Sequence, residues 1–191
     1  MESSVRTTDE PWEMPDELRD GEGSVVYLSL GSLGSADVEL MKRLVAVLAD
    51  SPHRFIVSKG PRANELELPG NMWGEARLPQ TSIIPRVDLV ITHGGNNTTT
   101  EALHFGKPMI VLPLFWDQYD NAQRVHELGF GIRLDTYGFA DDELRGAVDR
   151  LLADRDLRAG LAASGERIRA GDGTRVAADL IEGVGRDRRG L

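Results

Sequence analysis

The stretch that decides the fold is VDLVITHGGNNTTTEALHFGKPMIVL, residues 87–112. It opens with Val87–Thr92 and closes with Pro108–Leu112, two apolar runs with the composition of fully buried strands. Between them lie a glycine turn and a helix candidate over Asn97–Phe105. A strand, a helix and a second strand in so short a span predict a βαβ unit with parallel strands.

The same alternation continues on both sides of this unit. Further strand-like segments are Ser24–Leu30, Arg54–Ser58, Gly131–Leu134 and, more weakly, Asn71–Leu78, and helix-like segments are Asp37–Asp50, Gln118–Leu128 and the region from Asp141 onward. The pattern predicts an α/β fold, a Rossmann-like doubly wound parallel sheet of about six strands with helices on both faces.

The length of 191 residues fits one domain. Residues 1–23 combine acidic side chains with Pro11 and Pro15 and have little apolar content, so we expect a linker or tail there. The folded domain is expected over residues 24–183, and a short tail over 184–191.

Composition excludes several classes of function. A net charge of −9 repels phosphate backbones and argues against nucleic-acid partners. The absence of cysteine excludes disulfides, thiolate nucleophiles and cysteine-based zinc sites. No apolar run approaches the roughly 20 residues of a membrane span, and the acidic N-terminus is unlike a secretory signal, so we expect a cytoplasmic protein.

Three loops follow predicted strands: Gly31–Ser35, His93–Thr98 and Pro113–Gln118. The first two are rich in glycine, hydroxyl or amide groups, and the third ends in the carboxylate of Asp117 and the amide of Gln118. Because ligands of open parallel sheets bind at the carboxyl ends of the strands, we expect these loops to line one site.

The segment from His93 to Glu101 has the features of an anion site. Its glycines let backbone N–H groups approach a ligand at a helix start, and the imidazole of His93 adds a donor, which together suit a diphosphate. An alternative is plain helix capping, by Asn97 or by a capping box of Thr98 with Glu101. One cap needs only one polar residue, whereas this stretch has a histidine, two asparagines and three threonines in succession.

Residues 78–122 contain a longer pattern. It reads Leu78-Pro79-Gln80, then His93-x-Gly95-x-Asn97-Thr98-x-x-Glu101, then Pro113-x-x-x-Asp117-Gln118-x-x-Asn121-Ala122. This pattern resembles the nucleotide-sugar signature of family-one, UDP-dependent glycosyltransferases. With Val26–Ser32, which resembles the first strand and loop of that family, the resemblance covers about residues 24–134. It implies the C-terminal, donor-binding half of a GT-B fold.

The resemblance also implies roles for particular residues. The diphosphate would contact His93, Gly95, Asn97, Thr98 and Ser32, the ribose Glu101, the base Arg77, Leu78 and Gln80, and the transferred sugar Asp117 and Gln118. Arg77 departs from the family, which often has an aromatic residue there, but a guanidinium plane also stacks on a base. Glu101 favours a ribonucleotide, so UDP is the expected nucleotide and a hexose the expected sugar. Asp117 also fits a helix N-cap, and the two roles are compatible.

The family's acceptor site and catalytic base lie in an N-terminal half that this sequence does not contain. His53, His104 and His126 are interpreted as packing or solvated residues rather than a base. We therefore expect no catalytic residue in this chain, little or no transfer by it alone, and a partner domain in cis or in trans. An apolar face meant for that half can favour self-association.

No cofactor and no metal are expected, because the sequence has no typical set of metal ligands and the family's chemistry is metal-independent. Two other functions stay open at this point. One is half of a nucleotide-sugar epimerase, and the other is a non-catalytic nucleotide-binding module.

Overall fold

The computed structural model describes residues 4–6, 10–171 and 173–187. Its centre is a sheet of six parallel strands in the order β3-β2-β1-β4-β5-β6. The strands are β1 (Val25–Ser29), β2 (Arg54–Ser58), β3 (Met72–Glu75), β4 (Leu89–Thr92), β5 (Met109–Val111) and β6 (Gly131–Arg133). This arrangement confirms the predicted doubly wound α/β fold, and the strand order reverses between β1 and β4.

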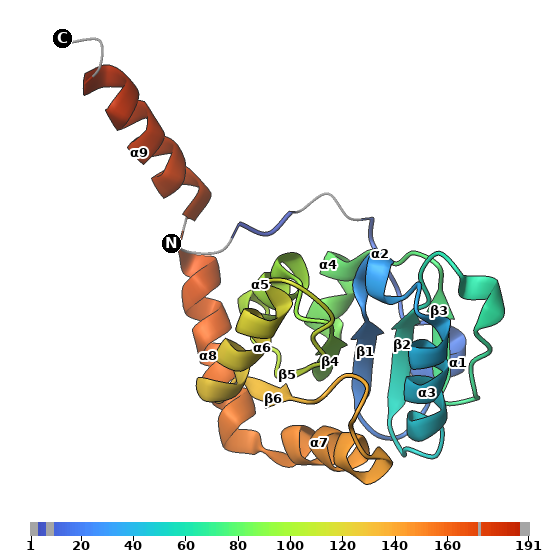
Figure 1. Cartoon of the computed structure of the whole chain (residues 1–191). Helices are drawn as coiled ribbons and strands as arrows, with labels where there is room; N and C mark the ends of the chain where they lie inside the picture. Colours follow the sequence, from blue (N-terminus) through green and yellow to red (C-terminus); the bar gives the residue numbers. More distant parts are fainter. Residues whose placement is uncertain (1–3, 7–9, 172, 188–191) are drawn as a thin grey trace.

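Helices cover both faces of the sheet (Figure 1). The helices are α1 (Asp16–Arg19), α2 (Gly31–Gly34), α3 (Val38–Leu48), α4 (Gln80–Ile83), α5 (Asn96–His104), α6 (Gln118–Glu127), α7 (Asp141–Ala153), α8 (Arg155–Ala170) and α9 (Gly173–Asp187), with 3-10 turns at Ala63–Glu65 and Ile84–Arg86. One face packs against α3 and α7, and the other against α4, α5 and α6. Among the described residues, no helix combines the length and the apolar character needed to cross a membrane.

The strands are apolar on both sides because each face has its own core. In β1, Val26 and Leu28 point into the core under α3 and α7, while Val25 and Tyr27 point into the opposite one. The other long strands alternate in the same way, as period-two side-chain geometry requires. This double burial is why the strands appear in the sequence as continuous apolar runs.

Part of the segment expected to be a linker is packed against the domain. Trp12 and Leu18 are 8% and 1% exposed and belong to the core on the α5 side. Arg54 fixes this segment: its Nη1 donates to the Leu18 carbonyl at 2.5 Å and its Nη2 to the Gly23 carbonyl at 2.8 Å. Two large apolar side chains are enough to anchor a segment whose overall composition is polar.

Two further segments differ from expectation. The expected glycine loop at Gly31–Ser35 contains the one-turn helix α2. Helix α9 continues to Asp187, so the expected tail at 184–191 begins inside a helix, and residues 188–191 lie outside the described part of the chain. Helix α9 extends away from the sheet (Figure 1).

Candidate functional site

The carboxyl ends of β1, β2 and β4 open into a cavity of about 830 Å³. Nine of the eleven predicted site residues line it: Ser32, Arg77, Leu78, Gln80, His93, Gly95, Asn97, Thr98 and Glu101. They come from five segments of the chain, namely α2, the residues after β3, the start of α4, the turn after β4, and α5. The strand reversal between β1 and β4 creates this opening, as the parallel-sheet rule predicts.

The imidazole of His93 lies between two glycines. A Cβ added to Gly95 would lie 2.6 Å from Nε2 of His93, and one added to Gly31 would lie 2.8 Å from Cε1. Any larger residue at either position would displace the ring. Glycine is therefore needed here for space, in addition to the left-handed backbone of Gly31, whose φ is +69°.

The surroundings of His93 favour a neutral imidazole and are compatible with a proton on Nε2. Burial lowers the pKa of His93, and the nearby charge of Asp117 opposes this only in part. The Thr92 hydroxyl accepts from the Gly94 N–H at 3.3 Å and lies 3.4 Å from Nδ1, so its own proton is free to point to Nδ1. In that tautomer Nε2 carries the N–H and is available as a donor in the cavity.

The start of α5 offers unused backbone donors. Gly95 occupies the N-cap position, and no side chain caps this helix. The capping interpretation of Asn97, Thr98 and Glu101 is therefore wrong for this helix. Because Asn96, Asn97 and Thr98 line the cavity, the uncapped start of the helix faces this cavity.

A buried polar network holds the carboxylate of Glu101, which is 4% exposed. Nε2 of Gln80 donates to Oε2 of Glu101 and, at 3.1 Å, to the hydroxyl of Thr98. The Tyr27 hydroxyl donates to Oε1 of Gln80 at 3.2 Å. The amide of Gln80 thus orients the Glu101 carboxylate, and the Tyr27 hydroxyl orients the amide of Gln80.

The two remaining predicted residues, Asp117 and Gln118, do not line the cavity. Gln118 is buried, and its Oε1 accepts from the N–H groups of Leu114 and Phe115 at 2.9 and 3.1 Å. Asp117 stands at the N-cap position of α6 without capping it. Asn121 links Asp117 to the His93 turn, because its Nδ2 donates to the Gly94 carbonyl at 2.8 Å and lies 3.4 Å from Oδ2 of Asp117.

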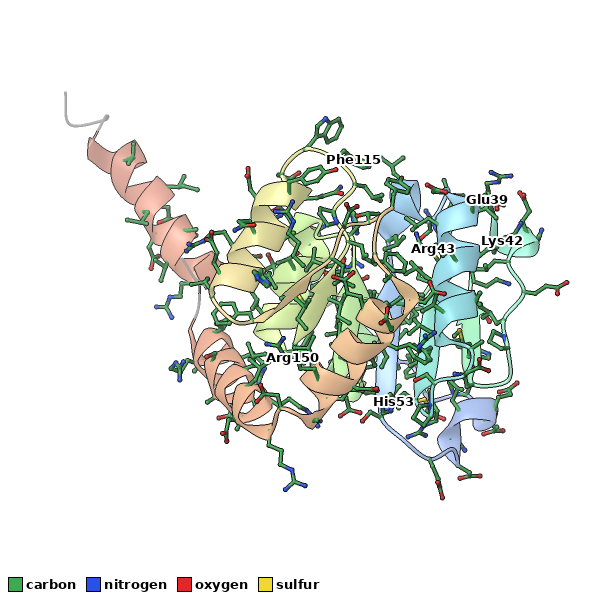
Figure 2. The ribbon with its side chains drawn as sticks, turned by 60° about the horizontal axis from the view of Figure 1, so that its bottom comes forward. Glu39, Lys42, Arg43, His53, Phe115 and Arg150 are labelled. Carbon is green, nitrogen blue, oxygen red and sulfur yellow. The ribbon has the colours of Figure 1, made fainter. Side chains whose placement is uncertain are left out.

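The loop that Gln118 braces ends in an exposed aromatic pair. Phe115 and Trp116 form an edge-to-face contact with ring centroids 5.1 Å apart. Trp116 is 81% exposed and adopts a left-handed backbone with φ +52°, which is rare for a bulky residue. Figure 2 shows Phe115 at one edge of the molecule and His53 at the other.

Sequence reasoning missed several lining residues: Arg6, Tyr27, Ser29, Ser58, Gly60 and Pro61. Ser29 and Ser58 end β1 and β2, so the signal that could have found them is a hydroxyl at the carboxyl end of a strand.

His53 lies away from this cavity. Its Nδ1 accepts from the Ser24 N–H at 3.2 Å, and its Nε2 is 3.4 Å from Asp149. In the described part of the chain, no three histidine or carboxylate side chains gather as metal ligands.

Comparison with known proteins identifies the family of this chain. Residues 39–182 match the model of the family described as "Erythromycin biosynthesis protein CIII-like, C-terminal domain". The chain belongs to this family. Among relatives of this EryCIII-like domain, the NDP-glycosyltransferase YjiC of Bacillus subtilis is 31% identical over 162 residues, 83% of this chain and 41% of that protein. Demethyllactenocin mycarosyltransferase of Streptomyces fradiae is 31% identical over 176 residues, 91% of this chain and 37% of that protein.

Solved structures agree with this assignment. The glycotransferase of kitacinnamycin superposes with a TM-score of 0.81 at 32% identity, covering 94% of this chain and 47% of that one. The calicheamicin glycosyltransferase CalG4 superposes with a TM-score of 0.78 at 28% identity, covering 92% and 46%. The EryCIII-like domain therefore spans less than half of these relatives and is the C-terminal half of a GT-B glycosyltransferase fold.

Proposed function

We propose that this EryCIII-like domain binds UDP-hexose, the donor from which a glycosyltransferase passes a sugar to an acceptor hydroxyl. The observation that carries the proposal is the cavity at the carboxyl edge, which gathers nine residues predicted for donor binding from five separate segments. Relatives named as an NDP-glycosyltransferase and a mycarosyltransferase support the reaction class.

The diphosphate fits the part of the cavity formed by α2, the His93 turn and the start of α5. Uncapped backbone N–H groups, the Nε2–H of His93 and the Ser32 hydroxyl would donate to phosphate oxygens. These donors are held before the ligand arrives, so they stabilise the charge that develops as UDP leaves. No metal is required for this step, because helix-start dipoles and hydrogen bonds supply the positive potential.

The nucleoside fits the part formed by α4, α5 and the residues after β3. The Glu101 carboxylate would accept both ribose hydroxyls, and the network through Gln80 and Tyr27 fixes its orientation. Arg77 and Leu78 would contact the uracil. Asp117, beside the His93 turn, and Gln118 would bind hydroxyls of the sugar that projects from the cavity.

The acceptor site and the base belong to a separate N-terminal domain, attached in cis or supplied in trans. In the complete enzyme, the base would deprotonate the acceptor hydroxyl, whose oxygen attacks the anomeric carbon while the bond to UDP breaks. The residues of this chain bind and orient the donor and do not supply a nucleophile. We therefore expect the chain alone to transfer sugar far more slowly than the roughly 1–1000 turnovers per second that are typical of enzymes.

Isothermal titration calorimetry with UDP and dTDP tests the proposal. We expect saturable UDP binding, weaker dTDP binding, and a loss of about tenfold or more in UDP affinity for His93→Ala and for Glu101→Ala, since each removes a buried polar contact. His126→Ala, on the exposed side of α6, is the control and should bind normally. Absence of UDP binding by the wild-type chain, or equal affinity in all variants, would contradict a donor site.

A second measurement distinguishes the other functions. UDP-glucose incubated with the chain alone should be recovered unchanged; a changed sugar would indicate an epimerase instead. Binding that persists without transfer, even after a matching N-terminal domain is added, would indicate a non-catalytic module.

A further inference from the structure

The amino-terminal edge of the sheet contains a second cavity, of about 300 Å³. It is lined by the residues that lead into β4 and β5 and by the first two turns of α8: Asp88, Phe105, Gly106, Lys107, Pro108, Arg155, Arg158 and Ala162. It shares no lining residue with the cavity at the carboxyl edge, which is called the donor cavity below after its proposed function. A ligand here would therefore not compete with the donor for the same groups.

Close backbone packing builds this second cavity. Gly106 has φ +65°, and a Cβ there would lie 2.6 Å from the Leu161 carbonyl oxygen. A Cβ on Gly165 would lie 2.8 Å from the backbone nitrogen of Gly106. The turn before β5 thus rests directly on the backbone of α8, which brings Lys107 to the same cavity as Arg155 and Arg158.

The charges in the cavity do not balance. Its lining has three cations, Lys107, Arg155 and Arg158, against one carboxylate, Asp88, so three minus one leaves an excess of two positive charges. Both carboxylate oxygens of Asp88 already accept hydrogen bonds within the protein. Oδ1 accepts from Nη2 of Arg158 at 2.7 Å, and Oδ2 accepts from the Val25 N–H at 3.0 Å.

The other two cations keep unused donors. Nζ of Lys107 donates to the neutral carbonyl of Pro85 at 3.0 Å. The guanidinium of Arg155 makes no hydrogen bond or ion pair with any residue that the structure describes. Burial lowers the pKa of Lys107, Asp88 opposes this, and the charges of Arg158 and Arg169 lower it further. An anion bound beside Lys107 would offset both the partial burial of its ammonium and the repulsion from Arg158.

We infer that this cavity binds a small organic phosphate. A phosphate monoester dianion matches the excess of two positive charges, whereas a carboxylate would leave one uncompensated. The guanidinium of Arg155 and the ammonium of Lys107 offer the donors that phosphate oxygens accept. Phe105 and Pro108 form an apolar wall, and the volume leaves room beside the phosphate for a few carbon atoms.

Titration of the isotopically labelled chain, followed by NMR, tests this inference. The probes are glycerol phosphate, inorganic phosphate and acetate at constant ionic strength and about pH 8, where phosphates with a second pKa near 6 are dianions. The His93→Ala background keeps the donor cavity from dominating. We expect the backbone signals of Gly106, Lys107 and Ala162 to shift saturably, with glycerol phosphate at least as tight as inorganic phosphate and acetate about tenfold weaker or more.

Substitutions of lining residues test whether glycerol phosphate binds in this second cavity. Lys107→Met and Arg155→Gln should each weaken glycerol phosphate binding by about tenfold, the usual effect of losing one charged hydrogen-bond donor. Arg145→Gln, which makes the same charge change on the exposed face of α7, should leave the affinity unchanged. Arg155 is exposed, so its variant keeps the test valid if Lys107→Met does not fold. Unshifted signals at Gly106 and Lys107, equal affinity in Arg155→Gln and the control, or acetate binding as tightly as phosphate would overturn the inference.

Discussion

At the scale of single residues, the donor cavity depends on glycines that give space to one imidazole. Replacing Gly95 by alanine places a Cβ 2.6 Å from Nε2 of His93, so the ring must move. We expect Gly95→Ala to weaken UDP binding by about tenfold or more, since the Nε2–H donor is displaced. Calorimetry with UDP measures the loss.

Gly70→Ala is the matched control for this change. A Cβ at Gly70 would meet no atom within 4 Å, and its backbone φ is outside the left-handed range. Its UDP affinity should equal that of the wild-type chain. If Gly95→Ala also binds normally, the position of His93 between the glycines does not matter for the donor.

The lowered pKa of His93 predicts how stability depends on pH. Between its lowered pKa and the ordinary value of 6.5, the unfolded chain binds more protons at this residue than the folded chain. The free energy of unfolding therefore falls as the pH drops through 6.5. His93→Gln removes this contribution, so the wild-type chain should lose more stability than the variant on acidification.

Urea unfolding of both chains above and below pH 6.5 measures this difference. His104, whose pKa burial and Arg169 also lower, is present in both chains and cancels. Parallel pH dependence of the two chains would show that burial does not affect the protonation of His93.

At the scale of elements, Arg43 joins α3 to the segment that leads into α7. Its guanidinium donates to the Tyr137 carbonyl at 2.9 Å and to the Phe139 carbonyl, and it lies 4.0 Å from the centroid of the Phe139 ring. We expect Arg43→Ala to lower the free energy of unfolding by about 2 kcal/mol, because two charged hydrogen bonds and a cation–π contact are lost together. Urea denaturation gives this value.

Lys42→Ala is the control on the same helix. Figure 2 shows Lys42 and Glu39 on the side of α3 away from Arg43, and their ion pair of 3.1 Å is exposed. Such surface pairs contribute only about 0–1 kcal/mol. A loss in Arg43→Ala no larger than in Lys42→Ala would mean that Arg43 does not hold the two elements together.

The order of strands and helices could be predicted because buried parallel strands and amphipathic helices have distinct patterns. Nine residues that line the cavity at the carboxyl edge could be predicted because they follow strands or match a dense motif. Other features depend on tertiary packing. Tyr27 resembles a core residue inside an apolar strand, and only the fold brings its hydroxyl to Gln80. The burial of Trp12 and Leu18 likewise needs a surface that the rest of the domain supplies.

At the scale of the whole molecule, α9 carries an exposed apolar stripe. Val176, Leu180, Ile181 and Val184 are 47%, 62%, 74% and 59% exposed, and the helix extends away from the sheet (Figure 1). We expect the chain to self-associate at high concentration through this stripe, because burying it removes apolar surface from water. Sedimentation equilibrium measures the association.

Leu180→Glu combined with Ile181→Glu should shift the association toward monomer. The control is Leu33→Glu, because Leu33 on α2 is an apolar residue of similar exposure, 68%. A wild-type chain that stays monomeric, or a Leu33→Glu variant that dissociates equally, would rule out α9 as the contact.

The exposure of Trp116 has an optical consequence. Of the three tryptophans, Trp12 is buried and Trp73 half-buried, so the indole of Trp116 emits from water while the other two emit from the protein interior. Acrylamide should quench the red side of the fluorescence spectrum first. A loop beside the donor cavity therefore contains an intrinsic fluorophore, whose emission can follow the arrival of a ligand or of a second domain without any added dye.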